Sequence, residues 1–145
     1  MSTRCLIGIQ RGNKVQYSYC HHDGYPEWVG KVLVNYYDTE PKITELLSFG
    51  DMSSLGAMLT LNPQYSGRLD DMVDSGCEFY ERDRGERGTY LHRPEVDADK
   101  YDFRCQSDAD YIYLFKDSEW YVLSAYAEDF EKVSDLLAKR NKEDN

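Results

Sequence analysis

Two pairs of strand-like stretches, one near each end of the chain, limit the folds open to this sequence. In the first pair, residues 3–10 and 14–20 place apolar side chains at every second position, and the stretch between them contains Gly12 and Asn13, which favour turns. In the second pair, residues 111–115 and 120–126 are rich in aromatic and β-branched side chains and are joined by a polar turn. Each pair therefore predicts a β-hairpin.

Helical spacing follows the first hairpin. Gly24-Tyr25-Pro26 ends the alternation, and apolar residues then recur about every 3.6 positions. The members of this apolar face are Trp28, Val29, Val32, Leu33 and Tyr36. A second helix is expected to begin at Asp38 or Thr39 and to end near Gly50, because these residue types cap helices. The spacing also predicts a capped turn at 51–55, leading into a short helical or irregular piece, and an amphipathic helix at 127–142.

The middle of the chain carries the weakest pattern. Glycine and proline interrupt residues 60–110 repeatedly, so only short strands are expected, at 77–81, 88–92 and 101–105. The whole order is ββαα, an irregular middle, then ββα. This order predicts the α+β class, with an antiparallel sheet built from two hairpins and helices packed on one face. A length of 145 residues fits a single domain spanning 1–145.

Charge and composition exclude several classes of function. The formal net charge is −10, and phosphate binding needs clustered Lys and Arg, so direct nucleic-acid binding is not expected. The sequence has no apolar run long enough to cross a bilayer, and the N-terminal stretch breaks off too soon for a signal peptide. The four cysteines form no C-x-x-C pair and are expected to be reduced thiols. Together these features favour a cytoplasmic protein with basic partners.

The densest group of reactive side chains lies where the second strand ends and the first helix begins. It is Cys20-His21-His22-Asp23-Gly24-Tyr25-Pro26. The free N–H groups of a helix N-terminus favour an anionic group, and imidazole and phenol rings can hydrogen-bond to such a group or stack on it. The predicted ligand or partner-binding residues are Arg4, His21, His22, Asp23, Tyr25 and Trp28.

Catalytic and metal chemistry receive less support from the same residues. Neighbours on a strand point to opposite sides, so Cys20 and His22 face away from His21 and Asp23. The other candidate metal ligands are His92, Cys77 and Cys105, whose spacing is not that of a zinc site. Cys5 superficially resembles an N-terminal nucleophile, although nothing else suggests the necessary cleavage. We therefore expect no metal, no cofactor and no catalytic residue.

A second candidate surface is acidic. Residues 95–110 hold six acidic and two basic side chains and are expected to form a surface loop. The acidic interaction surface is predicted at Asp97, Asp99, Asp102, Asp108 and Asp110. Thirteen tyrosines accompany only five phenylalanines, and such amphipathic rings suit interfaces as well as thin sheets.

Several segments together resemble a known group of proteins. They are Ser2-Thr3-Arg4, Tyr19 to Pro26 with Gly30, Gly50 to Leu55, and Trp120-Tyr121-Val122. With these segments the chain resembles a family of small uncharacterised proteins carried by bacteriophages, prophages and plasmids. The His-x-Asp-Gly-Tyr-Pro segment is the most specific part of the resemblance. The resemblance implies a phage or mobile-element origin and therefore a bacterial host cell.

Three functions remain open from the sequence. The leading hypothesis is a non-enzymatic inhibitor of a bacterial antiviral system, such as a CRISPR-type effector, acting by direct binding to a host defence protein. The first alternative is a small-ligand sponge, for example for a cyclic nucleotide. The second alternative is a hydrolase or transferase that uses Cys20 and the histidines. A homo-oligomer is compatible with each of them.

Overall fold

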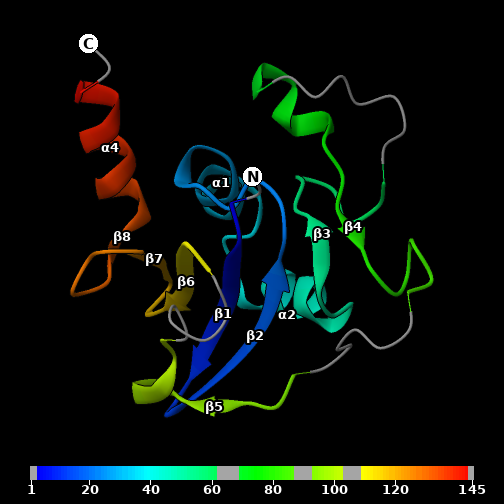
Figure 1. Ribbon diagram of the computed structural model, residues 1–145, viewed down its shortest axis with the longest axis horizontal. Coiled ribbons are helices and arrows are strands. Elements are labelled where there is room, and N and C mark those ends of the chain that lie inside the picture. The colour runs from blue at the N-terminus through cyan, green and yellow to red at the C-terminus, as the bar shows by residue number, and fades with distance from the viewer. Residues whose placement is uncertain (1–2, 62–68, 87–92, 103–108, 144–145) are drawn as a thin grey trace.

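The computed structural model describes residues 3–61, 69–86, 93–102 and 109–143. It forms a mixed sheet with helices on one face (Figure 1). The strands are β1 (Cys5–Arg11), β2 (Lys14–Cys20), β3 (Met52–Ser54), β4 (Glu78–Phe79), β5 (Val96–Asp97), β6 (Tyr111–Lys116), β7 (Glu119–Ser124) and β8 (Glu131–Lys132). The helices are the π-helix η1 (Pro26–Gly30), α1 (Lys31–Tyr36), α2 (Glu40–Ser48), the 3₁₀-helices η2 (Leu69–Asp74) and η3 (Ala98–Lys100), and α4 (Val133–Glu143).

Both expected hairpins are confirmed, as is the α+β class. β1 pairs with β2 and β6 pairs with β7, each antiparallel. The two hairpins join through β1 and β6, which run parallel, with Cys5 opposite Tyr111. The strand order is β4-β3-β2-β1-β6-β7-β8, and β5 pairs with β2 outside this path. The prediction of a wholly antiparallel sheet was therefore wrong: the sheet is mixed, because the first strands of the two hairpins lie side by side in the same direction and β3 also runs parallel to β2.

The helices gather on one face of the sheet, as expected. The inward side chains of β1, β6 and β7 pack there against η1, α1, α2 and α4. Val29, Val32 and Leu33 are completely buried, which confirms the apolar face predicted from their spacing. Tyr36 is only half-buried, and Tyr37 takes its place in the core. Its phenol donates a hydrogen bond to Gly56 O at 2.8 Å.

A smaller apolar cluster covers the opposite face. Tyr101 closes this side under Gly8, and its hydroxyl donates to Tyr113 O at 2.9 Å. Ala98, Ala127 and Phe130 pack around the same cluster. The segment leading through β5 and η3, seen at the bottom of Figure 1, thus takes the place of a second helical layer.

The sheet edges account for the local predictions that were wrong. Residues 52–54 form strand β3 beside β2 and not the predicted capped turn, since Cys20 pairs with Met52. The last helix begins at Val133, later than 127, because Glu131 and Lys132 first pair with β7 as β8. In both places pairing with an exposed sheet edge overrides the local pattern.

The middle of the chain was only partly predicted. The strand expected at 77–81 is shorter than predicted, because only Glu78 and Phe79 form β4. Of the strand expected at 101–105, Tyr101 and Asp102 are described, and neither belongs to a strand. Residues 88–92 and 103–105 lie outside the described part of the chain. The pairing of Val15 with Val96 in β5 was missed, because a two-residue strand leaves no periodic signal.

Candidate functional site

The His-Asp-Gly-Tyr segment forms a corner between β2 and η1, which we call the corner (residues 21–25). Asp23 turns the chain in the left-handed region with φ of 58°, which Asp tolerates better than most residues. At Gly24, an added Cβ would lie 2.9 Å from both Thr3 O and the Cβ of Cys5. Only glycine fits this close approach of the corner to the start of β1.

Hydrogen bonds from three parts of the fold hold the corner backbone. His21 N–H donates to Met52 O at 3.1 Å, and His22 N–H donates to Ser53 O at 2.9 Å. On the other side, Gly24 N–H donates to Thr3 O at 2.8 Å, and the Tyr113 hydroxyl donates to Gly24 O at 2.7 Å. The corner is therefore fixed by β3, by the entry to β1 and by β6.

The corner side chains face outward. His22 and Asp23 are exposed, while His21 and Tyr25 are half-buried. The Tyr25 hydroxyl donates to Asp23 Oδ1 at 3.4 Å. The rings of His21 and His22 meet edge to face with centroids 4.6 Å apart. The structure thus brings four of the predicted binding residues together on one rim.

The other two predicted binding residues occupy different positions. Trp28 is 6% exposed, and its Nε1–H donates to Leu55 O at 2.8 Å, so it is a core residue of η1. Arg4 is half-buried, and its backbone N–H donates to Asp110 Oδ2 at 3.3 Å. Its charge nevertheless acts on His21. Arg4 therefore lies beside the corner, whereas Trp28 belongs to the buried core and not to the binding surface.

Burial and nearby charges shift the pKa values of His21 and of its neighbour Tyr19. Burial lowers the pKa of His21 below its ordinary value, and the charges of His22, Arg4 and Arg84 lower it further. Burial raises the pKa of Tyr19 to about 12. Tyr19 Oη lies 2.6 Å from His21 Nδ1, in a hydrogen bond whose donor depends on the tautomer of His21.

The helix start beside the corner is unsuited to an anion. Pro26 has no N–H, and the N–H groups of Trp28 and Val29 both donate to Tyr25 O at 3.0 Å. Glu27 adds a negative charge to this first turn, where Arg140 binds it at 2.9 Å. Two of the first N–H groups are therefore already bonded, and the charge of Glu27 opposes the predicted attraction of phosphate or carboxylate to this helix N-terminus.

The thiols are placed for packing. Cys20 is completely buried on the helix side of the sheet, and its Sγ lies 3.6 Å from His22 O. Burial raises the pKa of Cys5 well above its ordinary value and that of Cys77 to about 11. A buried thiol with a raised pKa is a poor nucleophile. Cys105 and His92 lie outside the described residues, and the residues that the structure describes hold no group of three side chains able to bind a metal ion.

The predicted acidic surface is not a single patch. Asp97 pairs with Lys14 at 2.5 Å beside the first hairpin turn, and Asp99 and Asp102 are exposed around η3. Asp110 lies at the opposite end of β1, next to Arg4. At about 3.3 Å per residue, the length of β1 separates these ends by about 20 Å. Asp108 lies outside the described residues.

Two features escaped the sequence analysis. Arg93 Nη2 binds Asp51 Oδ2 at 2.7 Å, which fixes the turn before β3 across 42 positions of sequence. The side chain of Tyr126 is 100% exposed on the loop between β7 and β8. An ion pair between residues 42 positions apart and the exposure of one tyrosine among thirteen leave no pattern in the sequence, so only the fold reveals them.

Comparison of the chain with protein-family models, with curated protein sequences and with solved structures found no match. Among the described helices, none has both the length and the apolar character that crossing a membrane requires. The site must therefore be interpreted from its own geometry.

Proposed function

We propose that this chain acts by binding a protein partner through the corner, without a chemical step of its own. The supporting observation is the contrast between backbone and side chains. The backbone of His21, His22 and Gly24 is held by hydrogen bonds to neighbouring segments, while the side chains of His22 and Asp23 remain exposed. A surface already fixed in its bound shape loses little conformational entropy on association.

The shape of this region suits a protein more than a small molecule. Hollows lie between α1 and α4, at the β6–β7 turn and beside Tyr126, and the corner residues line none of these hollows. Small ligands prefer concave sites that bury most of their surface. Tyrosine and histidine rings on an open rim are instead typical of protein recognition.

The nature of the partner follows from charge and from the resemblance. A net charge of −10 favours a basic partner, such as a nuclease that binds nucleic acid. The resemblance to phage and prophage proteins supports a place inside an infected bacterial cell. The proposed function is thus that of a phage-encoded inhibitor of a CRISPR-type effector, acting by direct binding.

A plaque assay tests this function. The chain is expressed in bacteria whose CRISPR system targets an infecting phage, and plaque formation is counted. Wild type should restore plaques, and the double variant His22→Ala with Tyr25→Ala should lose at least about tenfold of the effect, since aromatic anchors carry much of the energy of an interface. Lys100→Ala, on exposed η3, is the matched control and should act like wild type.

Binding to the purified effector separates the outcomes. The wild-type chain should bind it directly, and the affinity should fall as salt rises. If the corner variant restores plaques as well as wild type, or if wild type restores none, the proposal is wrong. Thermal stabilisation of the chain by a cyclic nucleotide, lost in His21→Ala, would favour a ligand sponge instead.

A further inference from the structure

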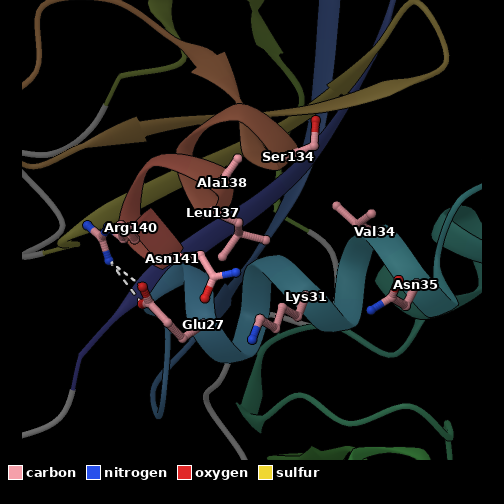
Figure 2. Close-up of a pocket in the computed structure, with 9 residues that line it drawn as sticks. All are labelled: Glu27, Lys31, Val34, Asn35, Ser134, Leu137, Ala138, Arg140 and Asn141. Atoms are coloured by element: carbon pink, nitrogen blue, oxygen red, sulfur yellow. Dashed lines mark hydrogen bonds and ion pairs between the residues drawn. The ribbon is translucent and has the colours of Figure 1, made fainter. Parts of the chain in front are cut away.

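A groove runs between η1, α1 and α4 on the helical side (Figure 2). Its volume is about 410 Å³. Figure 2 shows Leu137 projecting from α4 toward the helix that carries Val34 and Lys31. Val34 and Leu137 are half-buried, while Lys31 is exposed on the rim. The charged lining residues are Glu27, Lys31 and Arg140, and Glu27 pairs with Arg140, so Lys31 gives the rim above this apolar floor a net positive charge.

The loop between β7 and β8 carries an exposed aromatic ring and acidic side chains, which complement the groove. Its Tyr126 is 100% exposed, and Glu128 and Asp129 beside it are exposed as well. A large aromatic ring gains free energy when an interface covers it, and tyrosine is frequent among the residues that dominate interfaces. The loop offers an aromatic ring and two carboxylates, which are the groups that an apolar floor with a basic rim would accept.

Groove and loop lie next to each other on one surface. A second hollow of about 550 Å³ is lined by Tyr126, Tyr111 and Arg140, and Arg140 also lines the groove. Arg140 is held between them, with Nη1 donating to Glu27 Oε1 at 2.9 Å and Nη2 donating to Tyr111 Oη at 3.1 Å. Arg140 therefore lies between the loop and the groove of the same chain.

The charges on the two surfaces are complementary. Within the described residues, Lys31 on the rim takes part in no ion pair, and the same is true of Glu128 and Asp129 on the loop. We propose that two copies of this chain associate about a two-fold axis, each placing its loop in the groove of the other. Tyr126 packs on Val34 and Leu137, and Lys31 pairs with Glu128 and Asp129. A closed two-fold contact requires both complementary parts on one face, which is the arrangement seen here.

The overall charge sets the strength of this association. Two chains of −10 repel each other at distances within the Debye length, so the local contact must overcome that repulsion. We therefore expect a weak dimer that forms between micromolar and millimolar concentration. The inference is independent of the proposed function, because the corner takes no part in the contact.

Sedimentation equilibrium of the full chain measures the dimer. The mass should rise with concentration from 16.9 kDa to twice that value and no further. Tyr126→Ser should weaken the dimer at least about thirtyfold, the effect of losing an interface anchor. Lys31→Glu and Glu128→Lys should each weaken it about tenfold, because each places like charges in contact at both reciprocal sites. Lys100→Glu, remote from the groove, is the charge control and should leave the dimer unchanged.

A mixing experiment tests the reciprocal pairing. At a concentration where the tenfold weaker association leaves each variant monomeric on its own, Lys31→Glu chains and Glu128→Lys chains should form a mixed dimer with about wild-type affinity, because both contacts then join opposite charges. Unfolded variants could not produce this rescue. A wild-type chain that stays monomeric throughout, a mixture that fails to associate, or growth beyond two copies would each overturn the proposal. His22→Ala with Tyr25→Ala should still dimerise, so failure here and failure of the proposed function are separate results.

Discussion

The corner and the β7–β8 loop both present aromatic and acidic side chains to solvent, yet their backbones are held differently. The corner is fixed by β3, by the entry to β1 and by Tyr113, over sequence separations of up to 89 positions. In the loop, Ala127 N–H donates to Ser124 O, only three positions away. The corner backbone is therefore held by distant segments, whereas this loop hydrogen bond is local, and Ala127 and Phe130 connect the loop to the rest of the fold by packing in the cluster around Tyr101.

This difference separates two ways of making a recognition surface. The side chains of His21 and Tyr25 are half-buried and already in contact with neighbours, so binding has little left to order. Tyr126 is fully exposed, so a partner must supply its packing. Substitutions at the corner supports should consequently affect folding and binding together, whereas substitution of Tyr126 should affect association alone.

The largest effect on the free energy of unfolding is expected from adding a side chain at Gly24. Gly24→Ala places a Cβ 2.9 Å from Thr3 O, which is backbone and cannot move aside as a side-chain end would. We expect the free energy of unfolding to fall by about 2 to 3 kcal/mol, measured by urea denaturation. The control is Gly12→Ala, where φ is 60° and no atom lies within 4 Å, so the cost should be only about 1 kcal/mol. Equal costs at the two positions would contradict the packing argument.

A smaller effect is expected from removing the deepest support of the corner. Tyr113→Phe deletes the hydroxyl that donates to Gly24 O at 2.7 Å in a buried environment. The free energy of unfolding should fall by about 1 to 2 kcal/mol, since the carbonyl loses its donor without gaining water. Amide hydrogen exchange at Gly24 should also accelerate.

The half-buried Tyr121 on the neighbouring strand gives a matched control for Tyr113. Its ring contacts Lys116 with Nζ 5.0 Å from the ring centroid, and Tyr121→Phe preserves that ring. The change should therefore alter the unfolding free energy by less than about 0.5 kcal/mol. A Tyr113→Phe variant as stable as Tyr121→Phe would show that the corner does not depend on this hydrogen bond.

The pH dependence of stability tests the environment of His21 in the corner. The pKa of His21 in the folded chain lies below its ordinary value, so the unfolded chain takes up a proton first as pH falls. The contribution of His21 to stability is therefore complete above about pH 6.5 and declines as pH falls from there through the folded pKa. Urea unfolding at several pH values should show this decline in wild type and a reduced decline in His21→Gln.

Proton NMR can assign that titration to His21. Its ring should titrate below 6.5, and His22→Gln should move the titration upward, because the neighbouring charge helps to lower the pKa. A His21 ring that titrates at or above 6.5 would mean that burial and the surrounding cations do not act on it as the structure indicates.

The difference between local and distant contacts also explains which parts of the fold could be predicted from the sequence. Alternating residues and their turns identified both hairpins, because pairing between adjacent strands is encoded within about 20 residues. The corner was also located correctly, since Gly24 and Pro26 mark the change from strand to helix. In these places the local pattern and the tertiary structure agree.

Features that depend on distant contacts could not be found this way. β3 exists because Met52 meets Cys20 across the sheet, and β8 exists because Glu131 meets Val122. Trp28 was expected on the binding surface, yet the partner that draws its indole inward is Leu55 O. The exposure of Tyr126 likewise depends on which faces of β7 and α4 are already occupied.

The smallest effect on stability is expected at the loop. Tyr126→Ser removes a ring that is 100% exposed, so the free energy of unfolding should change by less than about 0.5 kcal/mol when measured at a concentration where the chain is monomeric. Gly24→Ala and Tyr126→Ser then form opposite extremes: the first lowers stability at any concentration, and the second alters only the concentration dependence. A monomer destabilised by Tyr126→Ser as much as by Tyr113→Phe would mean that the ring supports its own fold. The loop would then resemble the corner, and its tyrosine would no longer be available to a second copy.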